Sequence, residues 1–557
     1  MRKQLLKTQA NFIGDRFMRV KLLCATLMAV SAQGAFAAAD AKLYGGGATF
    51  PASAYGGVEW LTGPNTGTVT APIYNSVPSA PITRLLDLGA SGSYLATYTA
   101  STTNKPFGFP ANVKTAGAFS IGKTYTIKSL GTTDYNAIGV AALITPAVGT
   151  RFVATGVGSG TGTANEDVRP DLSYCQTGSG GGKNVLVGTK TANFSNVTVG
   201  SCGNFTGGAG GGFGSVRTDA DFVGTDSPMS GTEYTTFKTN KSATKGVPVQ
   251  IPVLAGAIGL VYNNVNTGKS LGSAPLVLTM KEVCQIFSGA INNWDYFGYP
   301  SKAIKIVYRS DKSGTSFGFS NSLSAMCPAQ GVTGFTTQET MASAFPLATA
   351  PSGFLTGSGN AGVIDAVGLN DGSIGYGDVN DAVARQRITP SLNDVNFFAI
   401  KAQSGINATT LKNYKAKSPL KVGKTFKIAS TDVVYDKTFA AGSNNASGRP
   451  TLTAIAGVPT ARANCMALVS PDAYGNAPKD AAGDYTIYPL QAVTYMLFNS
   501  NGNGDNAINL QQLAGAFYGS FAAPAIKNTV TSISATQGFS YLVGFNPTTQ
   551  IKNCIGF

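Results

Sequence analysis

The sequence contains no histidine among its 557 residues. This absence removes the side chain that most often serves as a general base in enzymes and as a ligand in metal sites. Charged residues are also scarce, at 12% of the chain, and like charges form no long run. A nucleic-acid surface needs clustered Lys and Arg with aromatic platforms, and the sequence shows neither. We therefore expect no nucleic-acid partner, no metal and no other cofactor.

Long apolar segments are absent after residue 37, where no stretch reaches the ~18–20 residues that a membrane helix needs. Residues 1–37 themselves have the pattern of an export signal. Basic residues precede an apolar segment at 22–30, and small residues lead up to Ala37, the expected cleavage site. The sequence thus predicts a periplasmic or secreted protein whose mature chain has no membrane span.

The start of the protein has two candidates, Met1 and Met18. Residues 1–17 do not look like the beginning of an export signal, which favours Met18. The formal net charge of +14 overstates the charge of the exported protein, because several basic residues lie within 1–37.

The chain has seven cysteines, and removal of the predicted signal, which contains Cys24, leaves an even number. An even count in an exported chain predicts disulfides. Zinc binding is the alternative, but the sequence has neither a Cys-x-x-Cys pair nor a histidine to support it. Many pairings are possible in principle; the sequential one is the simplest, and it joins Cys175–Cys202, Cys284–Cys327 and Cys465–Cys554.

Buried strands alternate with helices over much of the chain, which predicts an α/β fold with mixed sheets. Residues 247–263 are interpreted as a pair of buried strands, and 303–309 as a buried strand that ends at Arg309. After Thr279, a predicted helix cap, apolar residues recur at helical spacing within 278–294. The length exceeds what one hydrophobic core supports, so we expect two or more domains.

Residues 61–165 and 403–484 break this alternation. Both stretches are rich in Thr, Gly and Ala, carry few helix signals and contain many short β-like segments. We interpret them as β-rich insertions into the α/β scaffold. The first is similar to small β modules of phage tail fibres and bacterial surface proteins.

A candidate anion site follows the predicted strand that ends at Arg309. A short turn leads from Arg309 into a predicted helix through Ser313, Gly314 and Thr315. The guanidinium offers a planar fork of donors to an oxyanion, and the first N–H groups of a helix have no internal partner. The two hydroxyls add donors, and the glycine lets an anion approach the backbone. A capped helix beside a surface arginine is the alternative interpretation.

Three other segments offer similar chemistry. Thr49 follows a glycine-rich turn, Ser179 lies in another, and Asp226 ends a strand in front of a predicted helix. Each has an ordinary alternative as a turn residue or a helix cap. Their occurrence together with the Arg309 loop favours the anion-site interpretation over these alternatives.

Taken in order, these segments resemble the phosphate-binding proteins of bacterial ABC importers, including the secreted DING-type branch. The resemblance covers most of the chain outside the two insertions. It implies a two-lobed periplasmic-binding-protein (Venus-flytrap) fold, with residues 42–250 and 485–557 in the first lobe and 251–384 in the second. The matching segments are GGGATFPA, YCQTGSGGGK, GTDSPMS, LTMKEVCQIFSGAINNWD, RSDKSGTSF and GVIDAVGLNDGSIGY.

The resemblance also implies which residues contact phosphate. Ser159, in GVGSG, is a second choice for the role of Ser179, because it belongs to the inserted β-rich segment. Of the disulfides, Cys284–Cys327 and Cys465–Cys554 match the DING-type pattern, whereas Cys175–Cys202 is particular to this chain. The implied phosphate-binding residues are Thr49, Phe50, Ser179, Asp226, Arg309, Ser313, Gly314 and Thr315.

The leading hypothesis is an exported phosphate-binding protein that closes two lobes on the anion. Asp226 would accept a hydrogen bond from the O–H that phosphate keeps near neutral pH and that sulfate lacks. An ABC permease or a secretion system is the expected partner. The alternatives are a secreted DING-type alkaline phosphatase and an extracellular attachment protein. The enzyme is the weaker reading, because the sequence offers no base or metal-ligand set for it.

Overall fold

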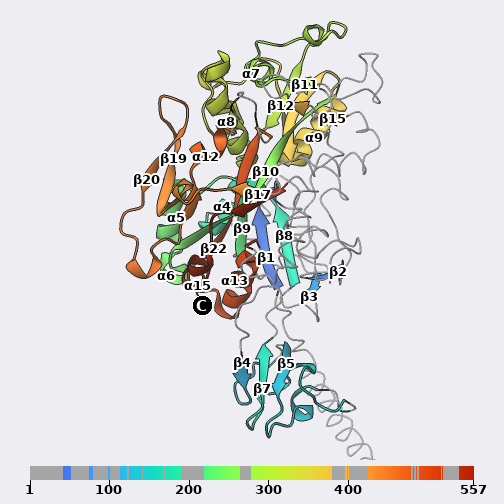
Figure 1. Ribbon diagram of the computed structural model, residues 1–557, viewed down its shortest axis with the longest axis vertical. Coiled ribbons are helices and arrows are strands. Elements are labelled where there is room, and N and C mark those ends of the chain that lie inside the picture. Colours follow the sequence, from blue (N-terminus) through green and yellow to red (C-terminus); the bar gives the residue numbers. More distant parts are fainter. Residues whose placement is uncertain are drawn as a thin grey trace, which may run out of the picture. The chain divides into compact units, whose positions relative to one another are not determined.

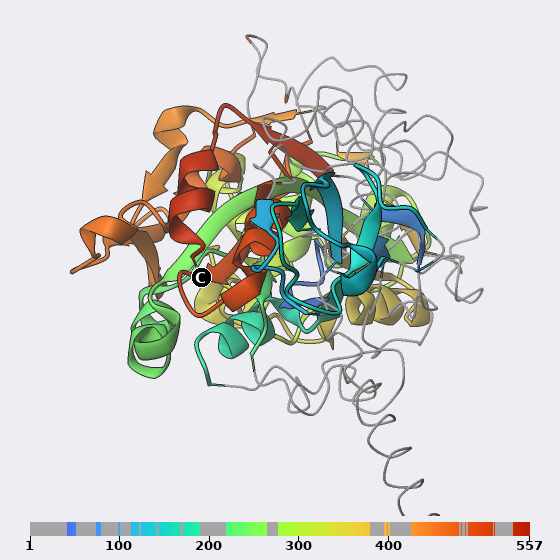
Figure 2. The same ribbon diagram turned by 90° about the horizontal axis from the view of Figure 1, so that it is seen from below.

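The computed structural model describes the segments that Figures 1 and 2 draw as coloured ribbons. The predicted signal peptide (1–37) and Cys202 lie outside the described residues. The described residues are 42–51, 74–78, 98–100, 113–121, 124–140, 142, 144–166, 171–189, 219–263, 277–378, 395–397, 399–400, 425–477, 481, 485, 488–515, 517–518 and 539–556.

The contacts divide the chain into two compact units. The smaller unit contains the described residues of 110–170, and the larger contains the described residues from Leu43 onward outside that range. The smaller unit is a four-stranded antiparallel sheet with the order β4-β7-β5-β6. Its strands are β4 (Val113–Thr115), β5 (Thr124–Ser129), β6 (Arg151–Val153) and β7 (Thr163–Glu166).

The smaller unit has a hydrophobic core of its own, centred on four aromatic residues. The rings of Phe119 and Tyr125 lie 4.9 Å apart, and those of Tyr135 and Phe152 lie 5.4 Å apart. The Tyr135 hydroxyl donates to the carbonyl of Ser129 at 2.9 Å, so this buried ring has its polar group satisfied. The predicted β-rich character of the first insertion is confirmed for these residues.

The larger unit is built on an 11-stranded mixed sheet, which confirms the predicted α/β class. The main path of the sheet runs β13-β12-β14-β10-β22-β9-β1-β8. Strands β15 (Val395–Phe397), β17 (Thr425–Lys427) and β23 (Phe539–Val543) pair off this path. The strands of the path are β1 (Lys42–Gly47), β8 (Asp171–Gln176), β9 (Phe222–Thr225), β10 (Pro248–Asn263), β12 (Lys305–Arg309), β13 (Leu355–Gly357), β14 (Ser373–Asp378) and β22 (Gln491–Asn499).

Strand β10 corrects one prediction. Residues 247–263 were expected to form a pair of strands, but Pro248–Asn263 is one continuous, buried strand of 16 residues. Pro252 does not end it, because the register against β22 shifts between Pro252 and Leu254, and such a bulge tolerates the missing N–H. Strand β10 pairs with β22 along residues 248–257 and with β14 along residues 258–262.

The change of partner along β10 defines two half-sheets. We call β8, β1, β9, β22 and the first part of β10 the first half-sheet. The second half-sheet consists of the remainder of β10 with β14, β12 and β13. Figure 1 shows the long β10 ribbon running through both.

Helices follow the strands of both half-sheets, and the side chains of Ser230, Thr279 and Ser313 cap the starts of three of them. The Thr279 side chain accepts from the N–H of Glu282, as expected for the predicted cap of α7. The apolar face of that helix is buried through Val283, Ile286 and Phe287. The helices are α4 (Gly178–Leu186), α5 (Gly231–Asn240), α6 (Ser242–Lys245), α7 (Met280–Phe287), α8 (Gly314–Met326), α9 (Gly359–Leu369), α12 (Pro471–Gly475), α13 (Ala507–Gly515) and α15 (Thr548–Cys554).

The described part of the second predicted insertion, residues 425–477, belongs to the larger unit. Strand β17 pairs with β23 of the main sheet, and Met466 and Val469 are buried in the core of that unit. The boundaries of the predicted lobes and of this insertion therefore remain a prediction. The remaining short strands of the structure are β2 (Tyr74–Pro78), β3 (Tyr98–Ala100), β11 (Val277–Leu278), β16 (Ala399–Ile400), β18 (Val433–Tyr435), β19 (Lys437–Asn444), β20 (Pro450–Ala454) and β21 (Ala467–Val469).

Two of the three predicted disulfides are present among the described residues. One joins Cys284 of α7 to Cys327 at the end of α8, and the other joins Cys465 to Cys554 of α15. The pair Cys175–Cys202 remains a prediction, because Cys202 is not described.

None of the helices in the described segments has the length and the apolar content needed to cross a membrane.

Replacement of both Cys465 and Cys554 by Ala should lower the free energy of unfolding by about 4 kcal/mol. The bridge closes a loop with a sequence separation of 89 residues, and a long loop loses much entropy when it is closed in the unfolded chain. Urea unfolding followed by circular dichroism measures the change. An unfolding curve identical to that of the wild type would show that this bridge does not contribute to stability.

Candidate anion-binding site

The predicted site residues lie where strands of the two half-sheets end. Strands β1 and β9 run parallel, and Thr49 and Asp226 follow their carboxyl ends. Ser179 follows β8, which neighbours β1 in the sheet. In the second half-sheet, β12 runs parallel to β13 and ends at Arg309. Ligands of open α/β sheets bind at such carboxyl ends, where the connections leave in different directions.

Contacts between these loops show that they converge. The backbone N–H of Asp226 donates to Ser179 Oγ at 3.2 Å, and Thr315 Oγ1 donates to Asp226 Oδ2 at 3.5 Å. A Cβ atom on Gly314 would lie 2.5 Å from Ser179 Oγ and 2.6 Å from Asp226 Cβ. Only glycine therefore allows the start of α8 to come this close to the first half-sheet.

Arg309 is held in a fixed orientation inside the protein, with 1% of its surface exposed. Its Nε and Nη2 atoms donate to the two carboxylate oxygens of Asp311 at 2.7 and 2.5 Å, and Nη1 donates to Asn360 Oδ1 at 2.8 Å. Burial alone would lower the pKa of Arg309, but the charge and hydrogen bonds of Asp311 raise it above the ordinary value. These three bonds leave two guanidinium N–H groups for a ligand.

The first turn of α8 supplies further donors. Ser313 is the N-cap, and its side chain accepts from the N–H of Ser316 at 3.1 Å, so the hydroxyl hydrogen is free to donate. The N–H groups at the start of the helix, including those of Gly314 and Thr315, have no partner within the helix. The positive end of the helix dipole and these N–H groups favour an anion here.

Several buried polar atoms around Arg309 have no hydrogen-bond partner among the described residues. They are Thr49 Oγ1, Asp226 Oδ1 and Asn360 Nδ2, and their residues are at most 3% exposed. Each buried polar atom that stays unsatisfied costs about 1–3 kcal/mol. The set combines donors and acceptors, which is what a small oxyanion with a remaining O–H would satisfy.

Asp226 is fully enclosed, and this burial raises its pKa to about 7. A hydrogen bond from Thr494 and the positive charge of Arg309 oppose the shift without cancelling it. Near neutral pH the carboxyl group is thus poised between an acceptor and a donor form. Its unpartnered oxygen can exchange a proton or a hydrogen bond with a ligand that itself carries an O–H.

The structure brings together the predicted Thr49, Ser179, Asp226, Arg309 and the loop of Ser313, Gly314 and Thr315. The side chain of Phe50 is buried in the core of the larger unit, and its predicted contact with the anion is through the backbone. Ser159, the second choice for the role of Ser179, belongs to the smaller β unit.

Two residues of the site were not predicted from the sequence. Asp311 fixes Arg309, and it also accepts from the N–H of Gly359 at 3.0 Å. Asn360, at the start of α9, fixes Arg309 from the other side. The signal for Asp311 was its position two residues after the arginine, whereas nothing in the sequence near Asn360 marks it as a site residue.

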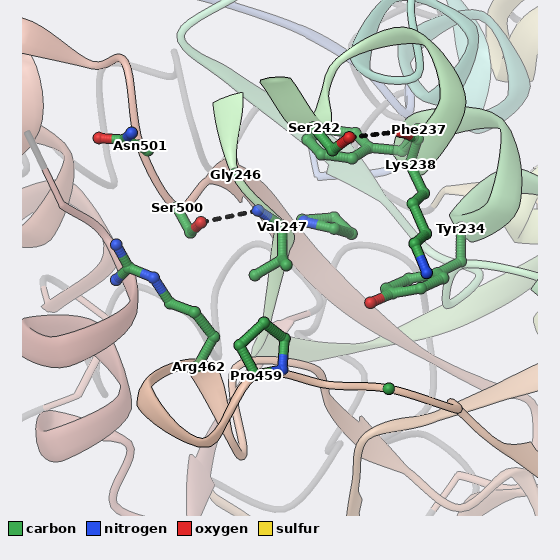
Figure 3. A pocket seen from close by; sticks show the side chains of 12 residues that line it. Tyr234, Phe237, Lys238, Ser242, Gly246, Val247, Pro459, Arg462, Ser500 and Asn501 are labelled. Atoms are coloured by element: carbon green, nitrogen blue, oxygen red, sulfur yellow. Dashed lines mark hydrogen bonds between the residues drawn. The ribbon is translucent and has the colours of Figure 1, made fainter. Parts of the chain in front are cut away.

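A separate cavity of about 320 Å³ lies elsewhere in the larger unit and is lined by Tyr234, Lys238 and Arg462, among others (Figure 3). Arg462 donates to the carbonyl of Asn553 at 2.7 Å. None of the predicted site residues lines this cavity. This cavity is therefore distinct from the site around Arg309.

The chain belongs to the PBP superfamily, since the PBP superfamily domain model matches residues 141–453. Among curated proteins it is similar to alkaline phosphatase L of Pseudomonas aeruginosa, with 31% identity over 219 residues, covering 39% of this chain and 51% of that protein. It is also similar to phosphate-binding protein PstS 3 of Mycobacterium tuberculosis, with 30% identity over 205 residues, 34% of this chain and 53% of that protein. The chain thus spans about half the length of these curated relatives.

Among solved structures, the chain is similar to a high affinity periplasmic phosphate-binding protein bound with phosphate. The identity is 22%, the TM-score is 0.43, and the match covers 68% of this chain and 85% of the other. A phosphate-binding protein from Stenotrophomonas maltophilia matches with 23% identity and a TM-score of 0.40, covering 68% of this chain and 86% of the other.

Replacement of Asp226 by Asn should stabilise the protein at pH 8 and have little effect near pH 4. The unfolded chain releases the Asp226 proton near pH 4, whereas the folded chain holds it to about pH 7. The folded state therefore binds the extra proton between these values, and the stability of the wild type falls as the pH rises through them. Thermal unfolding in phosphate-free buffers measures the difference.

The exposed Asp295, replaced by Asn, is the control for loss of a carboxylate outside the site. A difference between the Asp226 variant and the wild type that stays constant from pH 4 to pH 8 would mean that Asp226 does not titrate in this range.

Proposed function

We propose that the protein binds inorganic phosphate at the strand ends of the two half-sheets, as an exported protein of phosphate uptake or scavenging. The observation that carries the proposal is the set of unpartnered buried atoms around the fixed guanidinium of Arg309, namely Thr49 Oγ1, Asp226 Oδ1 and Asn360 Nδ2. A free oxyanion would satisfy all of them at once. The name of one of the curated relatives, phosphate-binding protein PstS 3, supports the same ligand.

Phosphate fits the donor and acceptor arrangement better than sulfate. Arg309, Ser179, Thr49 and the start of α8 donate to anion oxygens, while Asp226 accepts from a P–O–H group. Sulfate near neutral pH has no such hydrogen, so an ionised Asp226 would repel it without a compensating bond. The predicted role of Phe50 is to donate through its backbone N–H.

Binding would involve closure of two lobes, with residues 42–250 and 485–557 in the first and 251–384 in the second. The near-complete burial of Arg309 and Asp226 supports this, because an anion can reach them only if the protein opens. We predict that opening occurs near residues 250 and 380. After export and removal of residues 1–37, the protein would act in the periplasm or outside the cell, with an ABC permease or a secretion system as its partner.

Hydrolysis of phosphate esters is the second candidate, and the similarity to alkaline phosphatase L favours it. Within the described segments, no group of three or more His, Cys, Asp or Glu residues could hold a metal ion. The burial of Arg309 and Asp226 suits a free anion better than an ester, whose organic group needs space. We therefore place binding before hydrolysis.

Isothermal titration calorimetry of the mature protein with phosphate, sulfate and a phosphate monoester tests this function. We expect micromolar or tighter binding of phosphate and much weaker binding of sulfate. The variant Asp226→Asn should keep phosphate binding and lose part of the discrimination against sulfate, because an amide donates a hydrogen bond where the carboxylate repels.

Absence of heat on addition of phosphate would refute the binding function. Release of phosphate from the monoester at a rate that follows enzyme concentration would instead favour the phosphatase. A sulfate-to-phosphate affinity ratio that is the same in the variant and the wild type would remove Asp226 from the site.

Replacement of Arg309 by Lys should weaken phosphate binding about tenfold to a hundredfold, although the charge is kept. Lysine cannot reproduce the planar fork, and each charged hydrogen bond contributes about 1.5–3 kcal/mol. Calorimetry measures the affinity, and Arg462→Lys, at the separate cavity, is the matched control. An unchanged dissociation constant for Arg309→Lys would show that the guanidinium does not contact the anion.

A further inference from the structure

A second group of buried charged side chains lies directly behind the site, and none of them was among the predicted site residues. Lys183 Nζ lies 2.5 Å from Glu339 Oε1 and 3.0 Å from Glu233 Oε2. The side chain of Lys183 is 0% exposed and that of Glu339 is 5% exposed. Ser227, the neighbour of Asp226, also donates to Glu339. Such burial of charge is rare unless the geometry is well matched.

The members of this group come from both half-sheets. Lys183 lies on α4, the helix that begins with the Ser179 turn, and Ser227 follows β9 of the first half-sheet. Glu339 lies in the loop that leads from α8 into β13, a strand of the second half-sheet. The Lys183–Glu339 ion pair therefore joins the two half-sheets.

Glu339 is tied to the anion-binding loop as well. Its backbone carbonyl accepts from the N–H of Ser313, the N-cap of α8, at 3.0 Å. Lys312 lies in the same loop, and its Nζ atom is 3.7 Å from Glu339 Oε2. The backbone carbonyl of Lys312 accepts a hydrogen bond from the N–H of Gly180 at 3.2 Å. A change at Glu339 is thus transmitted to the donors on both sides of the site.

The pair remains charged in spite of its burial. Burial alone would lower the pKa of Lys183, but Glu233 and Glu339 raise it above the usual value. Burial would likewise raise the pKa of Glu339, and the charge of Lys183 holds it below the usual value. Lys183 and Glu339 therefore stabilise each other's charge in the interior, and Glu233 adds to the stabilisation of Lys183.

Entry of an anion requires Lys183 and Glu339 to separate. Arg309 and Asp226 are 1% exposed, so the arrangement in the structure is the closed one. When the half-sheets part, Glu339 leaves with the α8 loop and Lys183 stays with α4. The Lys183–Glu339 ion pair is formed only in the closed protein, whereas in the open protein Lys183 keeps Glu233 as its partner and Glu339 keeps Lys312.

We propose that Lys183 and Glu339 are positioning residues that form a latch between the half-sheets and set how long a bound phosphate is retained. Neither residue contacts the anion in this scheme. The pair acts by stabilising the closed state that holds Ser179, Asp226 and Ser313 around the ligand. This inference rests on the proposed phosphate binding.

The variant Glu339→Gln tests the latch, because it removes the charge and keeps the size of the side chain. Stopped-flow measurement should show that phosphate dissociates about tenfold faster or more, while the association rate stays close to that of the wild type. Loss of a contact that exists only in the closed state affects release and not encounter. The thermal stability of the phosphate-free protein should change little, which a merely structural role would not predict.

The control is Glu282→Gln, which removes a capping-box glutamate of α7 away from the site and should leave both rates unchanged. Lys183→Met should speed release as Glu339→Gln does, and the double variant should release phosphate no faster than the stronger single variant. If a charge-removing variant does not fold, Glu339→Asp keeps the charge, shortens the side chain and should still speed release.

Three outcomes would overturn the latch. The first is an unchanged phosphate dissociation rate in the folded Glu339 variants. The second is additive effects of the Lys183 and Glu339 substitutions on that rate, and the third is a loss of affinity that comes wholly from a slower association rate. Wild-type protein that does not bind phosphate at all would refute the proposed function instead, so the two failures are distinguishable.

Discussion

The rest of the site depends on one interaction, the bidentate ion pair between the buried guanidinium of Arg309 and the carboxylate of Asp311. A cation so removed from water needs a partner, yet a binding site needs the same cation to remain available. The pairing at Nε and Nη2 meets both demands, because it neutralises the charge at long range and still leaves donors on the opposite edge. The amide of Asn360 fixes the remaining rotation.

The architecture places this interaction where two sets of strands meet. Thr49, Ser179 and Asp226 follow the ends of strands β1, β8 and β9, and Arg309 is the last residue of strand β12. Because β10 contributes to both half-sheets, one continuous strand connects the two sets. The same arrangement turns Glu339 toward Lys183, so that the chemistry of the anion and the contact between the half-sheets depend on the same loops.

The sequence was sufficient for features that are determined locally. Helix α7 was predicted from Thr279 and its apolar spacing, and the anion loop was predicted from Arg309, Ser313 and Gly314. Features that depend on distant partners were missed. The pairing with β22, more than two hundred residues away, decides that Pro252 does not divide β10. Asn360 and Glu339 gain their roles only through contacts that form when the chain folds.

The smaller unit has its own aromatic core, formed by Phe119, Tyr125, Tyr135 and Phe152. Selection on such a module is separate from selection on the anion site, since its packing is satisfied by residues of 110–170 alone. Over evolutionary time, related chains are therefore expected to differ most in this unit and least in the loops around Arg309.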